Sequence, residues 1–287
     1  MPVRVDAASA GRAACGITGG NHALGENQTM LRVETDGAVA TITLARPKAR
    51  NALSTAMMAA LIEALAGIGE DIRCIVLAAE GPVFCAGHDL REITAHRADA
   101  DEGAGFFAAA MDQCATLMQA IVAQPQPVIA AVQGMATAAG CQLVASCDLA
   151  VASTAARFCT PGVEIGLFCS TPAVALSRAV PRKAAMEMLL TAEPIGAEAA
   201  RGLGLVNRVV APERLAEEAA TLAAAIAARS GVAVRMGKRS FNAQIGLPLP
   251  EAYATAAATM TENLLAEDAA IGIGAFLDKR APVWRHR

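Results

Sequence analysis

The stretch GMATAAGCQLVASCD, Gly134–Asp148, places a turn of small residues directly before a short helix. The apolar run Val128–Val132 precedes it and predicts a buried strand. Large side chains do not cover the backbone N–H groups in such a turn, and the helix dipole adds positive potential there. The stretch therefore predicts a site that stabilises a negatively charged oxygen. Its polar member, Gln142, is an amide that forms hydrogen bonds but takes up no proton at neutral pH.

The composition is that of a chain with a large core and few charges. The 287 residues are 54% hydrophobic, 18% charged and 3% aromatic, and the mean hydropathy is +0.40. The net charge of −3 argues against a nucleic-acid-binding protein, which would carry a basic patch. Since no apolar stretch appears long and uninterrupted enough to span a bilayer, we expect neither nucleic acid nor membrane as a partner.

The cysteines favour a reduced protein without a metal site. None of the eight forms a C-x-x-C pair, and the four histidines do not cluster with them. Most lie in apolar runs, where a reduced thiol packs as a small core residue. Because no apolar signal segment follows Met1–Val5, this usage predicts a cytoplasmic location.

The patterns along the chain predict three regions. Residues 1–28 are rich in Gly, Ala and Asn without periodicity, which is typical of a disordered tail. Over residues 29–211, short strand-like runs alternate with helical ones, with a hairpin at Asp36-Gly37 and a helix capped by Ser54. This alternation predicts an α/β fold with layered short sheets. Helical patterns dominate residues 212–287, which we expect to form a separate helical region.

Two separated segments carry a resemblance to a known family. Phe84–Leu90 (FCAGHDL) resembles the Phe-x-Ala-Gly-x-Asp-Leu motif of the enoyl-CoA hydratase/isomerase (crotonase) superfamily. Gly134–Asp148 resembles that family's second motif, Gly-x-Ala-x-Gly-Gly-Gly-x-Glu-Leu-x-x-x-x-Asp. Further matches are Arg46–Leu53 and Ala275–Arg280, so the resemblance covers about residues 29–284 through four ordered motifs.

The resemblance implies a fold, a ligand and a charge-stabilising site. The fold is a crotonase-type spiral of ββα units followed by a C-terminal helical oligomerisation region, assembled as a homotrimer or a dimer of trimers. The ligand is an acyl-CoA thioester, which is the substrate, with no separate cofactor. Two backbone N–H groups, which map to His88 and Ala139, polarise the thioester carbonyl and stabilise an enolate-like intermediate. The family prefers glycine at the second position, so the methyl group of Ala139 would tighten this oxyanion hole.

The sequence departs from the family where its hydratases have two catalytic glutamates. The first glutamate maps onto Gln142, and the register of Phe158–Gly166 places the second at Gly162. A general acid or base typically supplies about 10²–10⁴-fold, so we expect little ordinary hydratase activity. Phe168–Pro172 and Ala179–Lys183 resemble the enoyl-CoA hydratase domain-containing subgroup, which implies that the departure belongs to a lineage.

Two titratable side chains are candidates to replace the missing carboxylates. Glu164 lies two residues beyond Gly162, and in an extended segment it would point to the same face. The alternative interpretation of Glu164 is a carboxylate that lies on the subunit surface or forms an ion pair at a subunit interface. The His88 imidazole has a pKa suited to proton transfer, whereas the resemblance gives this position a backbone role. Gln142 would either position a water or substrate group or satisfy backbone groups at a helix end.

Other candidate residues surround the expected coenzyme A. The resemblance implies that Lys48 and Arg50 approach the phosphates, and that Lys279 reaches a coenzyme A commonly bound by another chain. For each of the three, the alternative is a solvated surface charge. The remaining predicted substrate contacts lie in the first motif and are Ala86, Asp89 and Leu90.

These patterns favour an enzyme of the lyase or isomerase type. A reaction that needs only enolate stabilisation, such as decarboxylation or isomerisation, fits the residues better than water addition. The alternative is a non-catalytic acyl-CoA-binding protein that keeps the fold without the chemistry. A purely structural oligomer fits less well, because the motifs that form the oxyanion hole persist.

Overall fold

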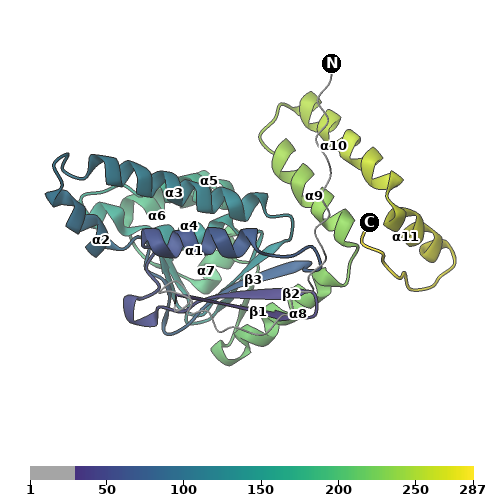
Figure 1. The fold of residues 1–287 in the computed structure, drawn as a ribbon, viewed down its shortest axis with the longest axis horizontal. Helices are drawn as coiled ribbons and strands as arrows, with labels where there is room; N and C mark the ends of the chain where they lie inside the picture. Colours follow the sequence, from purple (N-terminus) through teal and green to yellow (C-terminus); the bar gives the residue numbers. More distant parts are fainter. Residues whose placement is uncertain (1–29) are drawn as a thin grey trace, which may run out of the picture.

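The computed structural model describes residues 30–287, and the tail predicted for residues 1–28 lies outside this range. The chain forms a body of two β-sheets with packed helices, from which an arm of C-terminal helices projects (Figure 1). The α/β class and the C-terminal helices predicted from the sequence are confirmed.

The larger sheet of the described residues has six strands: in spatial order, β1 (Leu31–Asp36), β2 (Val39–Leu44), β3 (Cys74–Ala79), β5 (Val128–Val132), β7 (Leu149–Ser153) and β10 (Arg208–Val210). β1 and β2 form the predicted antiparallel hairpin, in which Gly37 takes a φ of +54°. All other neighbouring pairs in this sheet are parallel.

A second sheet contains the short strands β4 (Val83–Cys85), β6 (Met135–Thr137), β8 (Arg157–Cys159) and β9 (Ile195–Gly196), in that order. β4, β6 and β8 run parallel to one another. Along the chain, β3, β5 and β7 of the larger sheet are followed by β4, β6 and β8 of the smaller one, and each pair leads into a helix. This repeated unit is the predicted ββα spiral.

Seven α-helices of the body lie within residues 30–211, and side chains cap the first two of them. The seven are α1 (Thr55–Ala66), α2 (Leu90–Ala95), α3 (Ala104–Ala123), α4 (Ala139–Ser146), α5 (Ser170–Ala179), α6 (Arg182–Thr191) and α7 (Ala197–Leu203). Ser54 caps α1 as predicted, because its hydroxyl accepts the Met57 N–H. α3 starts at Ala104, and the Asp101 carboxylate before it accepts the N–H groups of Gly103 and Gly105.

α3 has the length and hydropathy of a membrane span, contrary to the expectation that no stretch of the chain does. In the body it packs against α1 and α4. Its residues Cys114, Leu117 and Ile121 lie in the main hydrophobic core. The apolar face of α3 is therefore used for packing inside the body.

Both faces of the larger sheet are covered, as β3 shows. Ile75 and Leu77 lie in the main core, whereas the alternate residues Cys74 and Val76 lie in a second cluster on the other face. α8 (Leu215–Ala227) supplies the helical side of this second cluster through Leu215, Ala219, Ala223 and Ala227. Although α8 belongs to the region from residue 212 that the sequence predicts to be helical, it packs on the sheet.

The arm begins after α8, where the helical axis bends by 101° into α9 (Gly231–Gln244). α10 (Leu249–Leu265) turns back and packs beside α9, and α11 (Glu267–Leu277) follows it within the arm (Figure 1). No residue of α10 is buried in the single chain. The arm thus presents large exposed apolar side chains, among them Leu249, Tyr253, Leu265 and Phe276.

Candidate active site

The two motifs meet because β4 and β6 are neighbouring parallel strands. Cys85 pairs with Ala136, so the loops that follow these strands leave the same edge of the sheet. Gly87 takes a φ of +80°, and a Cβ atom placed on it would lie 3.3 Å from the Ala139 nitrogen. Glycine at residue 87 is therefore what allows the first loop to approach the start of α4.

Both loops present backbone N–H groups without a backbone acceptor in the described residues. In the first loop, Ala86 donates to Arg50 O and Asp89 donates to Leu53 O, both at 3.1 Å. Between them, the His88 N–H has no acceptor within residues 30–287. The Ala139 N–H, at the first position of α4, also has none in this range, and no side chain caps the helix. Unpaired donors at a helix start form a ready site for an anion.

The His88 side chain is partly buried, and its imidazole is neutral at neutral pH. Burial lowers its pKa, and the charge of Glu92 one turn along α2 opposes this effect. Its Nε2 is buried with no hydrogen-bond partner in the described part of the chain. Glu92 is held in place because it accepts the N–H of Thr55 at 3.0 Å and its hydroxyl at 2.5 Å. A neutral imidazole beside the unpaired N–H groups has one nitrogen able to accept a proton.

Gln142 lies on α4 and is 4% exposed. The thiol of Cys114 on α3 donates to its Oε1 over 3.8 Å. Burial raises the pKa of Cys114 to about 11, so the thiol keeps its proton at neutral pH. Gln142 also lines a cleft of about 1570 Å³ between the body and α9. Its amide is thus anchored at one end, and Cys114 is a partner that the sequence did not reveal.

Gly162 sits in a place that is closed to side chains. A Cβ atom there would lie 2.9 Å from Cys169 Sγ, 3.0 Å from Leu167 O and 3.1 Å from Cys169 N. The sequence suggested a position from which a glutamate had been lost. The structure shows that the following loop fills the space into which such a side chain would project, so a glutamate at residue 162 requires this loop to move.

Glu164 does not lie on the face that the sequence suggested. Residues Pro161–Ile165 form a 3₁₀ helix rather than an extended segment. With three residues per turn, a residue two positions on points to a different side. Glu164 is exposed, and it has no hydrogen-bond or ion-pair partner among the described residues. The geometric argument for its replacing a carboxylate at residue 162 is therefore wrong.

The thiols near the site remain protonated at neutral pH. Burial raises the pKa of Cys141 to about 12, and it also raises the pKa values of Cys159 and Cys169. A nucleophilic cysteine needs a lowered pKa or a paired base. These three residues therefore pack the wall of the site rather than react.

The basic loop predicted to approach a coenzyme A lies beside the first motif. Lys48 is in the 3₁₀ helix Pro47–Ala49, Arg50 follows it, and both side chains are exposed. The fully buried Asn51 fixes this loop, because its Nδ2 donates to Glu80 O at 2.9 Å and to Val83 O at 2.8 Å. The positive charges are thus held next to the β4 loop.

The remaining predicted contacts have different positions. Asp89 caps α2 by accepting the Arg91 N–H at 3.1 Å, while Leu90 is 50% exposed and Ala86 is half-buried. Lys279 follows α11 at the end of the arm. In Figure 1, α11 lies in the arm, apart from α2 and α4, the helices that follow the two site loops.

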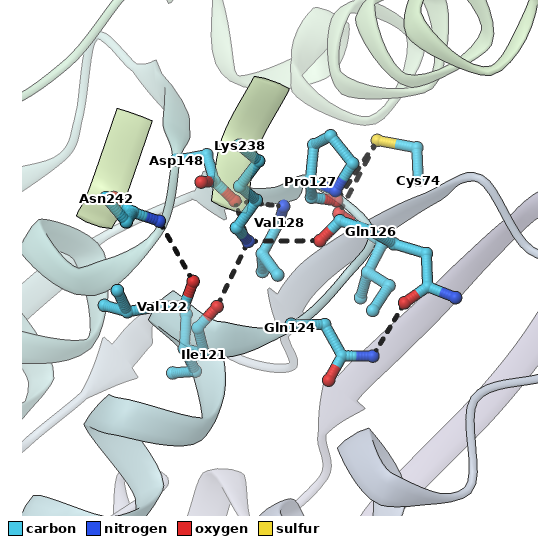
Figure 2. A network of polar contacts seen from close by, with 11 residues as sticks. Cys74, Ile121, Val122, Gln124, Gln126, Pro127, Val128, Asp148, Lys238 and Asn242 are labelled. Carbon is cyan, nitrogen blue, oxygen red and sulfur yellow. Dashed lines mark hydrogen bonds and ion pairs between the residues drawn. The ribbon is translucent and has the colours of Figure 1, made fainter. Parts of the chain in front are cut away.

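The other end of α4 is connected to the arm by a buried cation (Figure 2). The Nζ of Lys238 on α9 lies 2.6 Å from Asp148 Oδ2. It also donates to the carbonyl oxygens of Ile121 and Gln126, each at 3.2 Å. The same Asp148 oxygen accepts the Val128 N–H at 2.7 Å. This network fixes α9 to the ends of α3 and α4, and its lysine could not be identified from the sequence motifs.

A metal centre has no ligand set in the described residues. Between residues 30 and 287, no group of three or more His, Cys, Asp or Glu side chains is arranged to hold an ion.

Comparison with known proteins identifies relatives of the whole described chain. The family model described as "Enoyl-CoA hydratase/isomerase" matches residues 34–287. The mitochondrial enoyl-CoA hydratase domain-containing protein 3 of Rattus norvegicus is 49% identical over 247 residues, which are 85% of this chain and 81% of that protein. An enoyl-CoA hydratase crystal structure from Mycobacterium smegmatis has 51% identity and a TM-score of 0.85, and covers 89% of this chain and 98% of its own.

The predicted cytoplasmic location is wrong by the same comparison. The rat, mouse and human relatives, which are 48–49% identical, are all named as mitochondrial proteins. Cysteine usage reports only a reducing environment, whereas the compartment is set by short targeting segments that import receptors read. Core composition therefore could not distinguish these locations.

The human enoyl Coenzyme A hydratase domain-containing protein 3 supports the fold independently. Its crystal structure has a TM-score of 0.84 at 46% identity, and it covers 89% of this chain and 100% of its own. The chain belongs to the enoyl-CoA hydratase/isomerase (crotonase) family.

Proposed function

We propose that the chain binds a coenzyme A thioester and stabilises the enolate formed from it with the N–H groups of His88 and Ala139. The observation that carries the proposal is that the β4 and β6 loops each present an N–H without an acceptor in the described chain, next to each other across Gly87. One such donor is typically worth about 2.7–4 kcal/mol of transition-state stabilisation in a site that excludes water. The relatives named enoyl-CoA hydratases support a thioester as the ligand class.

The reaction that fits this site forms an enolate without a carboxylate base. Gln142 exchanges no proton, the space at Gly162 is closed, and Glu164 is exposed on another side of its 3₁₀ helix. Loss of CO₂ from a malonyl-type thioester meets this condition, because the electron pair of the broken C–C bond passes into the enolate. The enolate then takes up one proton, which comes from water, and we assign the relay of that proton to His88, on the loop that presents one of the two N–H donors.

A second candidate function is binding without turnover. The closed space at Gly162 and the high pKa values of the surrounding thiols leave few groups able to move protons. A protein of this kind would hold an acyl-CoA in the same place, with the same two N–H donors. It would show affinity for thioesters but no change in any of them.

The ligand's phosphates and the assembly follow from the charged and apolar surfaces. Lys48 and Arg50, beside the β4 loop, would bind the phosphates of coenzyme A, and no further cofactor is needed. The exposed apolar side chains of the arm would be buried between copies in a homotrimer or a dimer of trimers. In that assembly Lys279 of one copy would reach a coenzyme A on another. Light scattering on the purified protein would measure the number of chains.

Titration and turnover together test the proposal. Calorimetry with butyryl-CoA should show saturable binding that free coenzyme A only partly reproduces. Malonyl-CoA should lose CO₂ in the presence of the protein, while crotonyl-CoA should gain no water above the uncatalysed rate. Binding without either reaction would favour the non-catalytic function, and absence of binding to every thioester would refute both functions.

A further inference from the structure

Ala138, between β6 and α4, has a backbone conformation that suits glycine. Its φ is +51° and its ψ is −118°. This combination belongs to the first central position of a type II′ turn, which glycine dominates because a Cβ atom is strained there. Ala192 also has a positive φ, of 61°, but its ψ of 2° is close to the left-handed region that other residues enter. The strain at Ala138 is therefore of a different kind from that at Ala192.

Three contacts hold Ala138 in this conformation. Its N–H donates to Cys159 O at 3.0 Å, and its carbonyl oxygen accepts the Gln142 N–H at 3.0 Å. Its methyl group faces Gly87, since a Cβ atom placed on Gly87 would lie 2.9 Å from the Ala138 Cβ. The residue is thus fixed to β8, to the first turn of α4 and to the β4 loop.

The strained residue controls both unpaired donors. The ψ angle of Ala138 sets the plane of the peptide that joins it to Ala139, and so the direction of the Ala139 N–H. The Ala138 methyl group packs on Gly87, whose peptide bond carries the His88 N–H. One residue therefore sets the direction of one donor and limits how closely the other can approach.

We propose that Ala138 is a positioning residue, which uses its methyl group and its strained backbone to hold the two N–H donors at a fixed separation. This role rests on the proposed function, since the two N–H donors would be positioned to bind a thioester oxygen. The family motif has glycine at this position. Glycine would adopt the same angles with less strain, but it would leave the gap beside Gly87 unfilled and the turn free to move. Strain that persists at a site is typical of such preorganisation.

The Ala138→Gly variant tests this role, and Ala192→Gly is the matched control. Both variants relieve a positive φ at an alanine, so both should melt at a higher temperature than the parent protein. Only Ala138→Gly should bind butyryl-CoA more weakly, by about tenfold, because small misplacements of site groups cost up to about a hundredfold. The carbonyl stretch of bound ¹³C-labelled butyryl-CoA should also shift less in Ala138→Gly, since looser donors polarise the bond less.

Each outcome has a distinct meaning. If Ala138→Gly binds butyryl-CoA and shifts its carbonyl stretch as the parent does, the positioning role is wrong. If its melting temperature does not rise, the strain has no energetic consequence and the argument fails at its first step. If the parent protein binds no thioester, the proposed function and the positioning role both fail, while the two melting temperatures still report the strain alone.

Discussion

The two ends of α4 are built in opposite ways. At the N-terminal end, Ala138 is strained, no side chain caps the helix, and the Ala139 N–H has no acceptor within the described range. At the C-terminal end, the Cys147 N–H donates to two helix carbonyls, and Asp148 pairs with Lys238 of the arm (Figure 2). Eight residues separate an end with unpaired N–H groups from an end that an ion pair connects to the arm.

On the proposed function, one helix would combine binding at one end with support at the other. Unpaired buried donors cost stability, so they persist where a ligand can satisfy them. At the other end, the ion pair connects the residue after α4 to α9. Changes at the paired end should therefore affect folding, and changes at the unpaired end should affect binding.

The largest effect is expected from Lys238→Met, which breaks the paired end. It leaves Asp148 without its cation and the carbonyl oxygens of Ile121 and Gln126 without a donor. The lysine side chain is 7% exposed and the aspartate side chain 25%, so we expect a loss of about 3 kcal/mol in the free energy of unfolding. Urea titration would measure it. The control is Arg239→Met, which breaks an exposed pair with Glu262 and should cost less than about 1 kcal/mol.

Gly162→Ala should have the next largest effect, because it forces a methyl group against Cys169 Sγ and Leu167 O. Such overpacking typically costs about 1–3 kcal/mol in the free energy of unfolding. In a Cys169→Ala background the cost should shrink, since the sulfur is gone. The matched control is Gly202→Ala on α7, where no atom lies within 4 Å of the added Cβ. If the two substitutions changed the free energy of unfolding equally, the space at residue 162 would not be filled as described.

The pH dependence of stability should report the protonation of the partly buried His88 imidazole. Because burial lowers its pKa in the folded state, the unfolded chain binds the proton more readily, and the unfolding free energy should fall as the pH drops below about 6.5. One proton limits the slope to about 1.4 kcal/mol per pH unit. The difference between the parent and His88→Gln, followed by thermal melts from neutral to acid pH, isolates this contribution. A difference that does not change with pH would show that His88 titrates normally.

The smallest effect is expected from Glu164→Gln. The side chain is exposed and lies on a 3₁₀ helix, on another side from residue 162. Surface substitutions usually stay within about 0.5 kcal/mol, so kcat/KM for malonyl-CoA should change by no more than about twofold. A loss of a hundredfold or more would instead identify Glu164 as a proton carrier and restore the role that its sequence position first suggested.

Local signals predicted the elements well where neighbouring residues decide the backbone. The hairpin at Asp36-Gly37, the Ser54 cap and the strand Val128–Val132 each follow from residues within a few positions. The two motifs could be paired because parallel strands bring their ends to one edge, and β4 and β6 do so.

Contacts between distant residues could not be predicted in this way. Lys238 meets Asp148 across 90 positions, and Cys114 meets Gln142 across 28. Whether Gly162 is an emptied or a closed position depends on how the loop to Cys169 folds back. A local pattern of residue types does not predict which distant residues come into contact.

The sequence by itself determined the ββα repeat, the family and the two loops that supply the N–H donors, because periodicity, turn residues and motif spacing are local properties. Only the tertiary structure decided that the space at Gly162 is filled, that Glu164 faces elsewhere, that Lys238 ties the arm to α4, and that Ala138 is strained. These features depend on the close packing of atoms from separate segments, and close packing is set by the whole fold at once.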